Sequence, residues 1–419
     1  MMEAGSNGSS VTILGAGIVG ICSALELQEK GYSVEIIDRN EPGHGTSFGN
    51  AGVVSPWSCV PQSMPGIWKS IPRWLIDPYG PLKVRYREIP KLLPWITAFF
   101  ANTRLDKVHK ISSAMDMLMK GNIGAYRGYL KNTGRENLLR DSYFINVFRG
   151  QDKPNLEDLN WQLRIERGAP VEIVGRNELN ELEPELSDEI ETAVLVKQQA
   201  RVCEPAELCK TLTEKAIAQN AKFTRCDVRQ LYPTADNKIE IHASGGVSNV
   251  NKLLICAGIW SLDLLKPLGI NLPLVSERGY HLEFIDPGVR LNHSVLDVAG
   301  KFIISSMKDR IRSAGTSEFA DFRAPPNYQR ADMLAPLTKR LIPRLDCQNT
   351  RRWVGARPSF PDNLPAIGIL PGFDNIYCAF GHSHYGLGMA PATARIIASC
   401  INGEPSPENL SDVSVNRFL

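Results

Sequence analysis

VTILGAGIVG, residues 11–20, contains an apolar strand, a glycine-rich loop and the first turn of a helix. Apolar residues then recur at helical spacing up to Gly31, which can end the helix. A second apolar strand, residues 34–37, follows and ends on Asp38. This stretch predicts a strand–helix–strand unit and places the chain in the α/β class.

Each glycine of the loop has a structural role if the loop binds a dinucleotide. Gly15 permits the tight turn, Gly17 lets backbone N–H groups approach a pyrophosphate, and Gly20 lets helix and strand pack closely. Ile18 and Val19 begin the helix, whose N-terminus favours an anion. We therefore expect a pyrophosphate at this loop.

An acidic residue at the end of the second strand completes the nucleotide pattern. Asp38, with Arg39 directly after it, can accept hydrogen bonds from a ribose diol. G-x-G-x-x-G alone is weak evidence, and a glycine turn without a ligand is the plain alternative. The strand before the loop, the helix after it and Asp38 together favour a bound nucleotide.

Two further glycine-rich stretches bear on the choice between FAD and NAD. GTSFGNAG, residues 45–52, offers small and polar groups for phosphate and flavin: Thr46, Ser47, Asn50, Ala51 and Gly52. A second stretch, residues 379–390, contributes Gly381, His382, Gly386, Leu387, Gly388 and Met389. A cofactor contacted by both ends of a 419-residue chain is long and buried, as FAD is. An NAD-dependent dehydrogenase should lack the second stretch.

Composition excludes several other classes of protein. The net charge is +2, which gives no basic surface for nucleic acid. The nine cysteines form no C-x-x-C pair, as expected in a reducing compartment. The first ten residues are polar and contain no signal peptide, and no run of 18 apolar residues occurs. We expect a cytoplasmic protein, with contact to the inner face of the membrane left open.

The middle of the chain changes character several times. Residues 57–105 are rich in Pro and Trp, and prolines at that density predict an excursion without long regular elements. Helical periodicity returns over residues 106–140. Residues 278–316 alternate like antiparallel strands. The apolar surface of residues 57–105 predicts either docking on a membrane or partner, or packing within the protein's own core.

Longer motifs at both ends of the chain are typical of one family. They are VTILGAGIVGICSALELQEKGYSVEIIDR at 11–39, GTSFGNAG at 45–52, WVGARPSFPD at 353–362, PAIG at 365–368 and GHSHYGLGMAPATARIIA at 381–398. With LLICAGIWS at 253–261, the sequence resembles the D-amino-acid dehydrogenase and glycine-oxidase-like branch of the FAD-dependent amine oxidoreductases. The resemblance covers nearly the whole chain.

The resemblance implies a discontinuous Rossmann-type FAD domain capped by an α+β substrate domain built on an antiparallel sheet. The FAD domain is expected over residues 1–56, 195–274 and 346–419, and the substrate domain over 57–194 and 275–345. Further cofactor contacts implied by the family are Val228, Ala257, Gly258 and Trp260.

The resemblance also implies substrate contacts. The arginine of G-x-R-P, here Arg357, is expected to bind the substrate carboxylate, for which a planar guanidinium is suited. An ordinary structural ion pair is the alternative for Arg357. His384 and Tyr385 stand where a relative carries a polar residue facing the substrate. No Cys, Asp or Glu accompanies His382 and His384 at ligand spacing, so no metal site is predicted.

The expected reaction is FAD-dependent oxidation of a small D-amino acid, for example a cyclic one such as D-proline or D-hydroxyproline. A hydride passes to flavin N5 and leaves an imino acid, which water converts to the 2-oxo acid. Oxygen or a quinone reoxidises the flavin. Relatives with covalent flavin carry a cysteine where residues 359–362 read SFPD, so non-covalent FAD is expected. The alternatives are a sarcosine- or glycine-type amine oxidase and an FAD-holding subunit of a larger complex.

Overall fold

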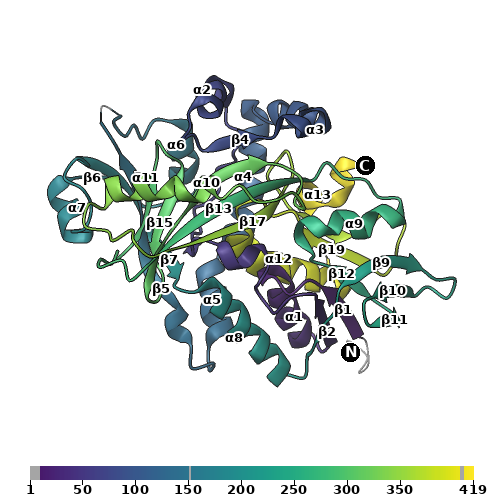
Figure 1. The fold of residues 1–419 in the computed structure, drawn as a ribbon. Coiled ribbons are helices and arrows are strands. Elements are labelled where there is room, and N and C mark those ends of the chain that lie inside the picture. The colour runs from purple at the N-terminus through teal and green to yellow at the C-terminus, as the bar shows by residue number, and fades with distance from the viewer. Residues whose placement is uncertain (1–9, 151, 406–409) are drawn as a thin grey trace.

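The computed structural model describes residues 10–150, 152–405 and 410–419. Two large sheets lie side by side, with helices packed on their outer faces and a third, small sheet at one end (Figure 1). The expectation about the polar N-terminus concerns residues 1–9 for the most part, and these lie outside the described residues.

The six-stranded sheet contains the predicted strand–helix–strand unit. Its order is β18-β19-β12-β1-β2-β8, and all neighbours are parallel except β18 and β19. The strands are β1 (Ser10–Leu14), β2 (Ser33–Asp38), β8 (Lys222–Arg225), β12 (Leu253–Ile255), β18 (Ala366–Ile369) and β19 (Ile376–Phe380). Strands from both ends and the middle of the chain therefore form one sheet, as a discontinuous domain requires.

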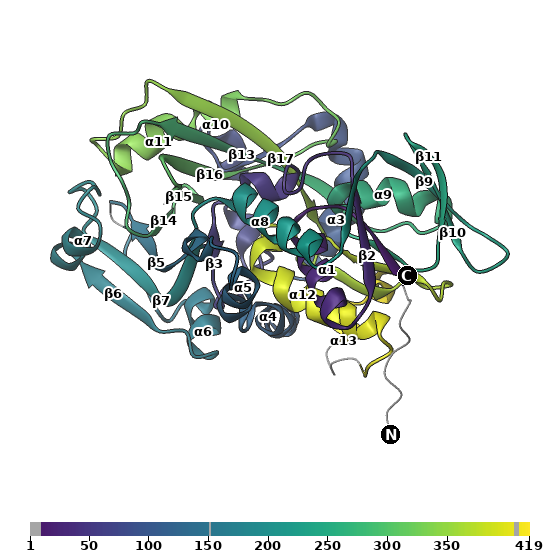
Figure 2. The same cartoon turned by 90° about the horizontal axis from the view of Figure 1, so that it is seen from below.

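Three helices cover one face of this sheet. They are α1 (Ile18–Glu29), α8 (Pro205–Ala218) and α12 (Gly386–Ile401). The helix α1 packs against both α8 and α12 (Figure 2). Its residues Ile21 and Cys22 are fully buried in the core that these helices share with the sheet, which keeps the cysteine away from solvent.

The second large sheet is mainly antiparallel. Its order is β17-β13-β16-β15-β14-β5-β7-β3, with β4 paired to β16 and β6 paired to β7. The strands are β3 (Val53–Val54), β4 (Leu82–Val84), β5 (Leu139–Phe148), β6 (Val171–Gly175), β7 (Thr192–Val202), β13 (Val275–Ile285), β14 (Ser294–Asp297), β15 (Phe302–Ser306), β16 (Arg310–Phe319) and β17 (Thr350–Ser359). The antiparallel alternation predicted for residues 278–316 is confirmed in β13 to β16.

The remaining elements surround the two sheets. The small third sheet contains β9 (Val228–Pro233), β10 (Ile239–Ala243) and β11 (Gly246–Val250). The other helices are α2 (Ile71–Ile76), α3 (Ile89–Ala101), α4 (Leu105–Met119), α5 (Asn122–Leu130), α6 (Leu159–Ile165), α7 (Arg176–Leu182), α9 (Ser261–Leu265), α10 (Gln329–Asp332), α11 (Leu334–Leu341) and α13 (Leu410–Val413).

The expectation that residues 57–105 lack long regular elements is wrong for α3. This helix runs for 13 residues with Pro90 in its first turn and Pro94 inside it. Pro90 lies where its missing N–H has no intrahelical partner. Pro94 follows one turn later, so only one interior hydrogen bond is lost, and buried Trp95 and Phe99 stabilise the helix by packing.

Sheet membership does not follow the expected domain boundaries everywhere. The strand β7 begins before residue 195 and pairs within the larger sheet, as does β17, which lies after residue 346. The boundaries themselves remain a prediction. No helix in the described ranges is long and apolar enough to cross a membrane.

Candidate active site

A cavity of about 1770 Å³ is walled by residues of both large sheets. Most of the residues predicted from the sequence to contact cofactor or substrate line it. They are Gly15, Gly17, Ile18, Val19, Asp38, Arg39, Thr46, Ser47, Asn50, Ala51, Val228, Ala257, Gly258, Trp260, Arg357, Gly381, His382, His384, Tyr385, Gly386, Leu387 and Gly388. The fold therefore brings segments from both ends of the chain to one space, as a long cofactor requires.

The glycine loop combines a strained turn with an open face. Gly15 has φ +115°, and a Cβ there would lie 2.5 Å from the carbonyl oxygen of Cys256. At Gly17, by contrast, a Cβ would meet nothing closer than Ser47 Oγ at 3.4 Å. Gly17 is also the N-cap of α1 and has no side chain to cap it, and among the described side chains only Ser47 Oγ accepts from the first turn, from the N–H of Ile18. The free space and the remaining N–H groups of that turn suit a pyrophosphate.

Asp38 and its neighbours form the far end of the cavity. The two carboxylate oxygens of Asp38 accept hydrogen bonds from the backbone N–H groups of Ala16 and Asn40, each at 2.8 Å. Each oxygen keeps further acceptor capacity for a ribose hydroxyl. The guanidinium of Arg39 lies 4.1 Å from the ring centroid of Trp260, so these two side chains form a flat wall.

The loop after β2 is tied to both sheets. Ser47 Oγ accepts a hydrogen bond from the N–H of Ile18 at 3.1 Å. Thr46 Oγ1 donates to the carbonyl of Ala356 on β17 at 2.8 Å. Ser47 and Thr46 therefore fix the position of the loop between the glycine turn and the larger sheet.

Three predicted cofactor residues do not line the cavity. A Cβ on Gly20 would lie 2.0 Å from the carbonyl oxygen of Gly15, so Gly20 serves helix packing, as its place in the motif predicts. Gly52 has φ +84°, and its carbonyl accepts a hydrogen bond from the N–H of Val202 at 2.7 Å. Met389, on α12, is fully buried in the core. These residues shape the site through packing.

Arg357 lies at the other end of the cavity, on β17. Its Nη1 donates to the carbonyl of Thr316 at 3.2 Å and lies 3.6 Å from Oε1 of Glu277. Glu277 is the direct cross-strand neighbour of Arg357 in the pairing of β13 with β17. A Cβ at Gly279 would lie 2.2 Å from Cζ of Arg357, so glycine at position 279 leaves room for the guanidinium.

Glu277 is the main residue of the site that sequence reasoning missed. This buried carboxylate accepts hydrogen bonds from Nε2 of His384 at 2.6 Å, Oγ of Ser359 at 2.9 Å and the hydroxyl of Ser317. Burial alone would raise the pKa of Glu277, but His384, Arg357 and Ser317 hold it well below its usual range. Its neighbours in the strand are Ser276 and Arg278, so no local sequence pattern singled out Glu277.

The histidines and the tyrosine of the C-terminal turn differ in their surroundings. His382 is buried and bonded through Nε2 to Thr393 Oγ1 at 3.0 Å, and burial lowers its pKa to about 3. His384 lines the cavity with 28% of its side chain exposed. The hydroxyl of Tyr385 donates to the carbonyl of Val60 at 3.0 Å, and burial raises its pKa to about 12. His384 and Tyr385 are therefore the two partly exposed side chains of the turn, whereas His382 is buried.

Two cations lie along another wall of the cavity. Arg164 on α6 donates to the carbonyl of Asn160 at 2.6 Å and lies 5.1 Å from the ring centroid of Trp161. Lys301 also lines the cavity, in the turn between β14 and β15. In the part of the chain that the structure describes, no carboxylate lies within 4 Å of either cation. Together with Arg357 they make the cavity favourable for an anionic ligand.

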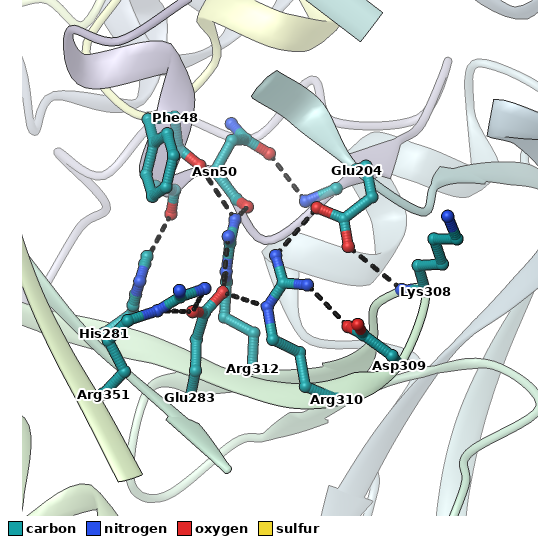
Figure 3. Close-up of polar contacts among 12 residues, drawn as sticks. Phe48, Asn50, Glu204, His281, Glu283, Lys308, Asp309, Arg310, Arg312 and Arg351 are labelled. Atoms are coloured by element: carbon teal, nitrogen blue, oxygen red, sulfur yellow. Dashed lines mark hydrogen bonds and ion pairs between the residues drawn. The ribbon is translucent and has the colours of Figure 1, made fainter. Parts of the chain in front are cut away.

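An ionic network around buried Glu283 joins the larger sheet to the 46–52 loop (Figure 3). The carboxylate of Glu283 accepts hydrogen bonds from Arg310 and Arg351, each at 2.8 Å, and from Arg312 at 2.7 Å. Arg312 also donates to the carbonyls of Phe48 and Asn50, at 2.9 and 2.6 Å. Arg312 therefore holds the 46–52 loop against the larger sheet.

Comparison with known proteins agrees with this geometry. The family model described as "FAD dependent oxidoreductase" (DAO) matches residues 10–400. The chain belongs to this family. Membership in the FAD dependent oxidoreductase family confirms the predicted cofactor and the predicted enzyme class.

Curated members of the family are similar over their whole length. The chain is 32% identical over 419 residues to a D-amino-acid oxidase of Bradyrhizobium diazoefficiens, covering 98% of this chain and 99% of the relative. It is 29% identical over 417 residues to a D-amino acid dehydrogenase of Vibrio cholerae, covering 97% and 98%.

Solved structures of the same fold include a glycine oxidase from Geobacillus kaustophilus, with a TM-score of 0.74 and 19% identity over 98% of each chain. An L-alpha-glycerophosphate oxidase from Mycoplasma pneumoniae with FAD bound has a TM-score of 0.69 and 17% identity, covering 95% of this chain and 96% of that one. The predicted fold class is confirmed. The cavity fits FAD in this chain because its volume, its open glycine loop and the start of α1 at Gly17 match a long, doubly charged ligand.

Proposed function

We propose that this FAD-dependent oxidoreductase oxidises a small D-amino acid to the imino acid, which water converts to the 2-oxo acid. The observation that carries the proposal is Arg357, a partly exposed guanidinium in a cavity whose other wall suits FAD. A planar guanidinium binds a carboxylate bidentately and gives it a fixed direction. The names of the curated relatives support the D-amino-acid class.

The chain's own residues bind and orient the reactants. The glycine loop and Asp38 hold the nucleotide half of FAD, while Ala51 and the first turn of α12 also line the cavity. No described side chain caps α12, so the N–H groups at its start favour an anion. When bound, FAD supplies the two-electron acceptor for the hydride that leaves Cα. The protein fixes carboxylate, Cα and flavin in line and excludes water.

We further propose cyclic D-amino acids, such as D-proline or D-hydroxyproline, as substrates. The polar wall beside Arg357 supports this proposal, because His384 and Glu277 lie where an amine can bind. A sarcosine- or glycine-type amine oxidase and an FAD-holding subunit are the alternatives. A non-catalytic subunit has no need for Arg357 and Glu277 facing a cavity.

An anaerobic substrate screen tests this proposal. The purified protein should be yellow, release FAD on acid or heat treatment, and bleach when mixed with a D-amino acid under anaerobic conditions. The screen compares both enantiomers of proline and of 4-hydroxyproline with glycine and sarcosine, using an artificial dye as acceptor. Bleaching by L-enantiomers alone would overturn the substrate class, and a yellow protein that no amine bleaches would favour the non-catalytic alternative.

We also propose that the segment from residue 57 to 105 contacts the cytoplasmic face of an anionic membrane. A quinone in that membrane would then accept the electrons of the reaction. This segment, called here the α2–α3 arm, projects at one edge of the molecule (Figure 1). Its apolar side chains Trp68, Ile76 and Leu93 are exposed, Ile76 by 83%. Exposed basic residues lie among them: Lys69, Arg73, Lys83, Arg87 and Lys91. Apolar and basic side chains on one exposed segment favour an anionic lipid surface.

A further inference from the structure

Glu277 is surrounded by hydrogen-bond donors. The hydroxyls of Ser317 and Ser359, Nε2 of His384 and the guanidinium of Arg357 all face its carboxylate. An ionised carboxylate can only accept hydrogen bonds. The donors around Glu277 favour its ionised form, so the His384 nitrogen that faces it, Nε2, carries a hydrogen.

The other ring nitrogen of His384 is left open. Among the described residues Nδ1 of His384 has no hydrogen-bond partner, and this atom is not fully buried. The side chain is 28% exposed and lines the cavity. The Nδ1 atom is therefore accessible from the cavity in which Arg357 lies.

The charge state of His384 depends on few groups. The charges that act on it are Arg357 on β17 and Glu277 on β13, and Tyr385 is its aromatic neighbour in the turn. Burial, followed by Arg357, lowers the pKa of His384 even though Glu277 opposes the shift. The ring is therefore neutral near pH 7, with a lone pair on Nδ1.

We propose that Glu277 is a positioning residue that holds His384 in its Nε2–H tautomer, and that Nδ1 of His384 takes a proton from the substrate's amine. The inference rests on the proposed function. It adds the residue that prepares the amine for oxidation, because only an uncharged amine has a lone pair to form the C=N bond.

The proton and electron balance is simple. An N–H bond of the substrate ammonium breaks, and an Nδ1–H bond forms on His384. The resulting imidazolium is stabilised by the carboxylate of Glu277, which lies 2.6 Å from Nε2. As the Cα–H leaves with its electron pair, the amine lone pair forms the C=N bond. The proton returns to solvent after the product has left.

The first test measures binding without turnover. The ligand 1-aminocyclopentane-1-carboxylate has an amine and a carboxylate but no Cα–H, and cyclopentanecarboxylate lacks the amine as well. Binding to the holoenzyme is followed by the change in the flavin spectrum between pH 6 and 9. In the wild-type protein His384 accepts the proton on binding, so the Kd of the amino acid should change little with pH. In His384→Ala the ligand must bind already deprotonated, so its Kd should rise about tenfold for each pH unit below the amine pKa.

The outcomes of this test separate the inference from the proposed function. Cyclopentanecarboxylate should show the same pH dependence in both proteins. If neither ligand binds, the proposed function fails. If both bind and the Kd of the amino acid has the same pH dependence in the two proteins, the role of His384 fails while the proposed function stands.

The second test concerns Glu277 and uses turnover. Glu277→Gln keeps the size of the side chain, and its carbonyl oxygen can still accept from Nε2, while the serine hydroxyls can rotate to accept from its amide. Loss of the negative charge makes His384 a weaker base. The acidic limb of the kcat/KM profile should therefore move about 1–3 pH units lower, and the maximum value of kcat/KM should fall. His384→Ala should lose on the order of 10²–10⁴-fold at pH 7 and regain activity as pH rises.

Glu318 provides a matched control. It is a buried glutamate on the neighbouring strand β16, paired with Arg85 at 3.0 Å. Glu318→Gln should reduce thermal stability but leave the acidic limb of the kcat/KM profile in place. An unchanged profile in Glu277→Gln, or a loss in His384→Ala that is confined to hydroxylated substrates, would overturn the inference.

Discussion

The nucleotide end of the cavity is built from backbone, whereas its substrate end is built from charged side chains. At the first end, the turn at Gly15 and the open face of Gly17 present N–H groups and leave space. At the second end, Glu277 and Arg357 meet across neighbouring strands, and His384 joins them from the turn before α12. The nucleotide end has no space for an added side chain when the cofactor is bound. The substrate end depends on the identity of each side chain that lines it.

This difference predicts how each end fails. A substitution at the glycine loop should expel the cofactor, because a side chain there occupies ligand space. A substitution at the substrate end should leave FAD bound and change the chemistry, because the side chains there contact the smaller ligand. The following predictions test whether the two ends can be separated in this way.

The largest effect is expected for Gly17→Val. No protein atom lies closer than 3.4 Å to a Cβ at Gly17, so the protein itself should fold. The added side chain would instead occupy the space of the pyrophosphate. We expect a folded, colourless and inactive protein, measured by the ratio of flavin to protein absorbance together with circular dichroism.

Gly20→Ala is the control for the glycine loop. A Cβ at Gly20 would lie 2.0 Å from the carbonyl oxygen of Gly15, so this variant should lose folded protein rather than cofactor alone. A yellow, fully active Gly17→Val enzyme would remove the pyrophosphate from the glycine loop.

Glu283→Gln should have the next largest effect, a loss of stability in the ionic network that holds the 46–52 loop against the larger sheet. Removal of this charge leaves Arg312 buried without a full counter-ion, which costs about 3–5 kcal/mol in the free energy of unfolding. Urea unfolding followed by circular dichroism measures the loss. Glu189→Gln, which breaks the exposed pair with Arg340, should cost less than about 1 kcal/mol. Equal losses in both variants would contradict a structural role for the network.

The same network predicts a pH dependence of stability. Burial would raise the pKa of Glu283, but Arg312 and Arg310 lower it to about 2 from an ordinary value of 4.5. A lowered pKa in the folded state means that the stabilisation is present above pH 4.5. It should be lost as pH falls from there to about 2. In Glu283→Gln the decrease in the free energy of unfolding that Glu283 causes in this pH range should be absent, which unfolding measurements at each pH can show.

Arg357→Leu should act on the substrate end alone. An unpaired substrate carboxylate in a dry pocket costs roughly 2–5 kcal/mol, so kcat/KM should fall by more than about thirtyfold while FAD stays bound. The variant also leaves Glu277 without its cation. The double variant Arg357→Leu with Glu277→Gln removes that second effect, and it should still show the loss when compared with Glu277→Gln alone. Steady-state kinetics at saturating acceptor measure both variants, and unchanged kcat/KM would remove Arg357 from the site.

The sequence predicts the nucleotide end better because its determinants are local. Gly15, Gly17 and Asp38 lie within one strand–helix–strand unit; the glycines are explained by the backbone, and Asp38 by its carboxylate at the end of the second strand. Glu277 has no such local reason. Its role arises from the register that places it opposite Arg357 and from the turn that brings His384 to it.

Tertiary packing also determines two other features that the sequence did not predict. The helix α3 forms despite Pro94 because Trp95 and Phe99 are buried against the protein. The pairing of β13 with β16 shifts in register between Arg278 and Tyr280, with the extra residue on β16 beside Thr316, whose φ is +59°. Glu277 and Tyr280 both line the cavity, although they lie an odd number of residues apart on β13.

The smallest effect is expected far from both ends, on the α2–α3 arm. Replacing Trp68, Ile76 and Leu93 together with serine removes exposed apolar side chains and should leave folding and dye-linked activity unchanged. Binding to vesicles that contain anionic lipid, measured by co-sedimentation, should weaken by about tenfold or more, since each such side chain contributes on the order of 1 kcal/mol. Ile173, Ile217 and Val247, which are also exposed, provide a matched triple replacement elsewhere on the surface. High salt should weaken wild-type binding further, because the basic residues of the arm act through screened charge. If the two triple variants bind vesicles equally well, or if the wild-type enzyme ignores anionic lipid and reduces oxygen at its full turnover rate, the arm has no membrane role, and the cavity with its two ends accounts for the whole function.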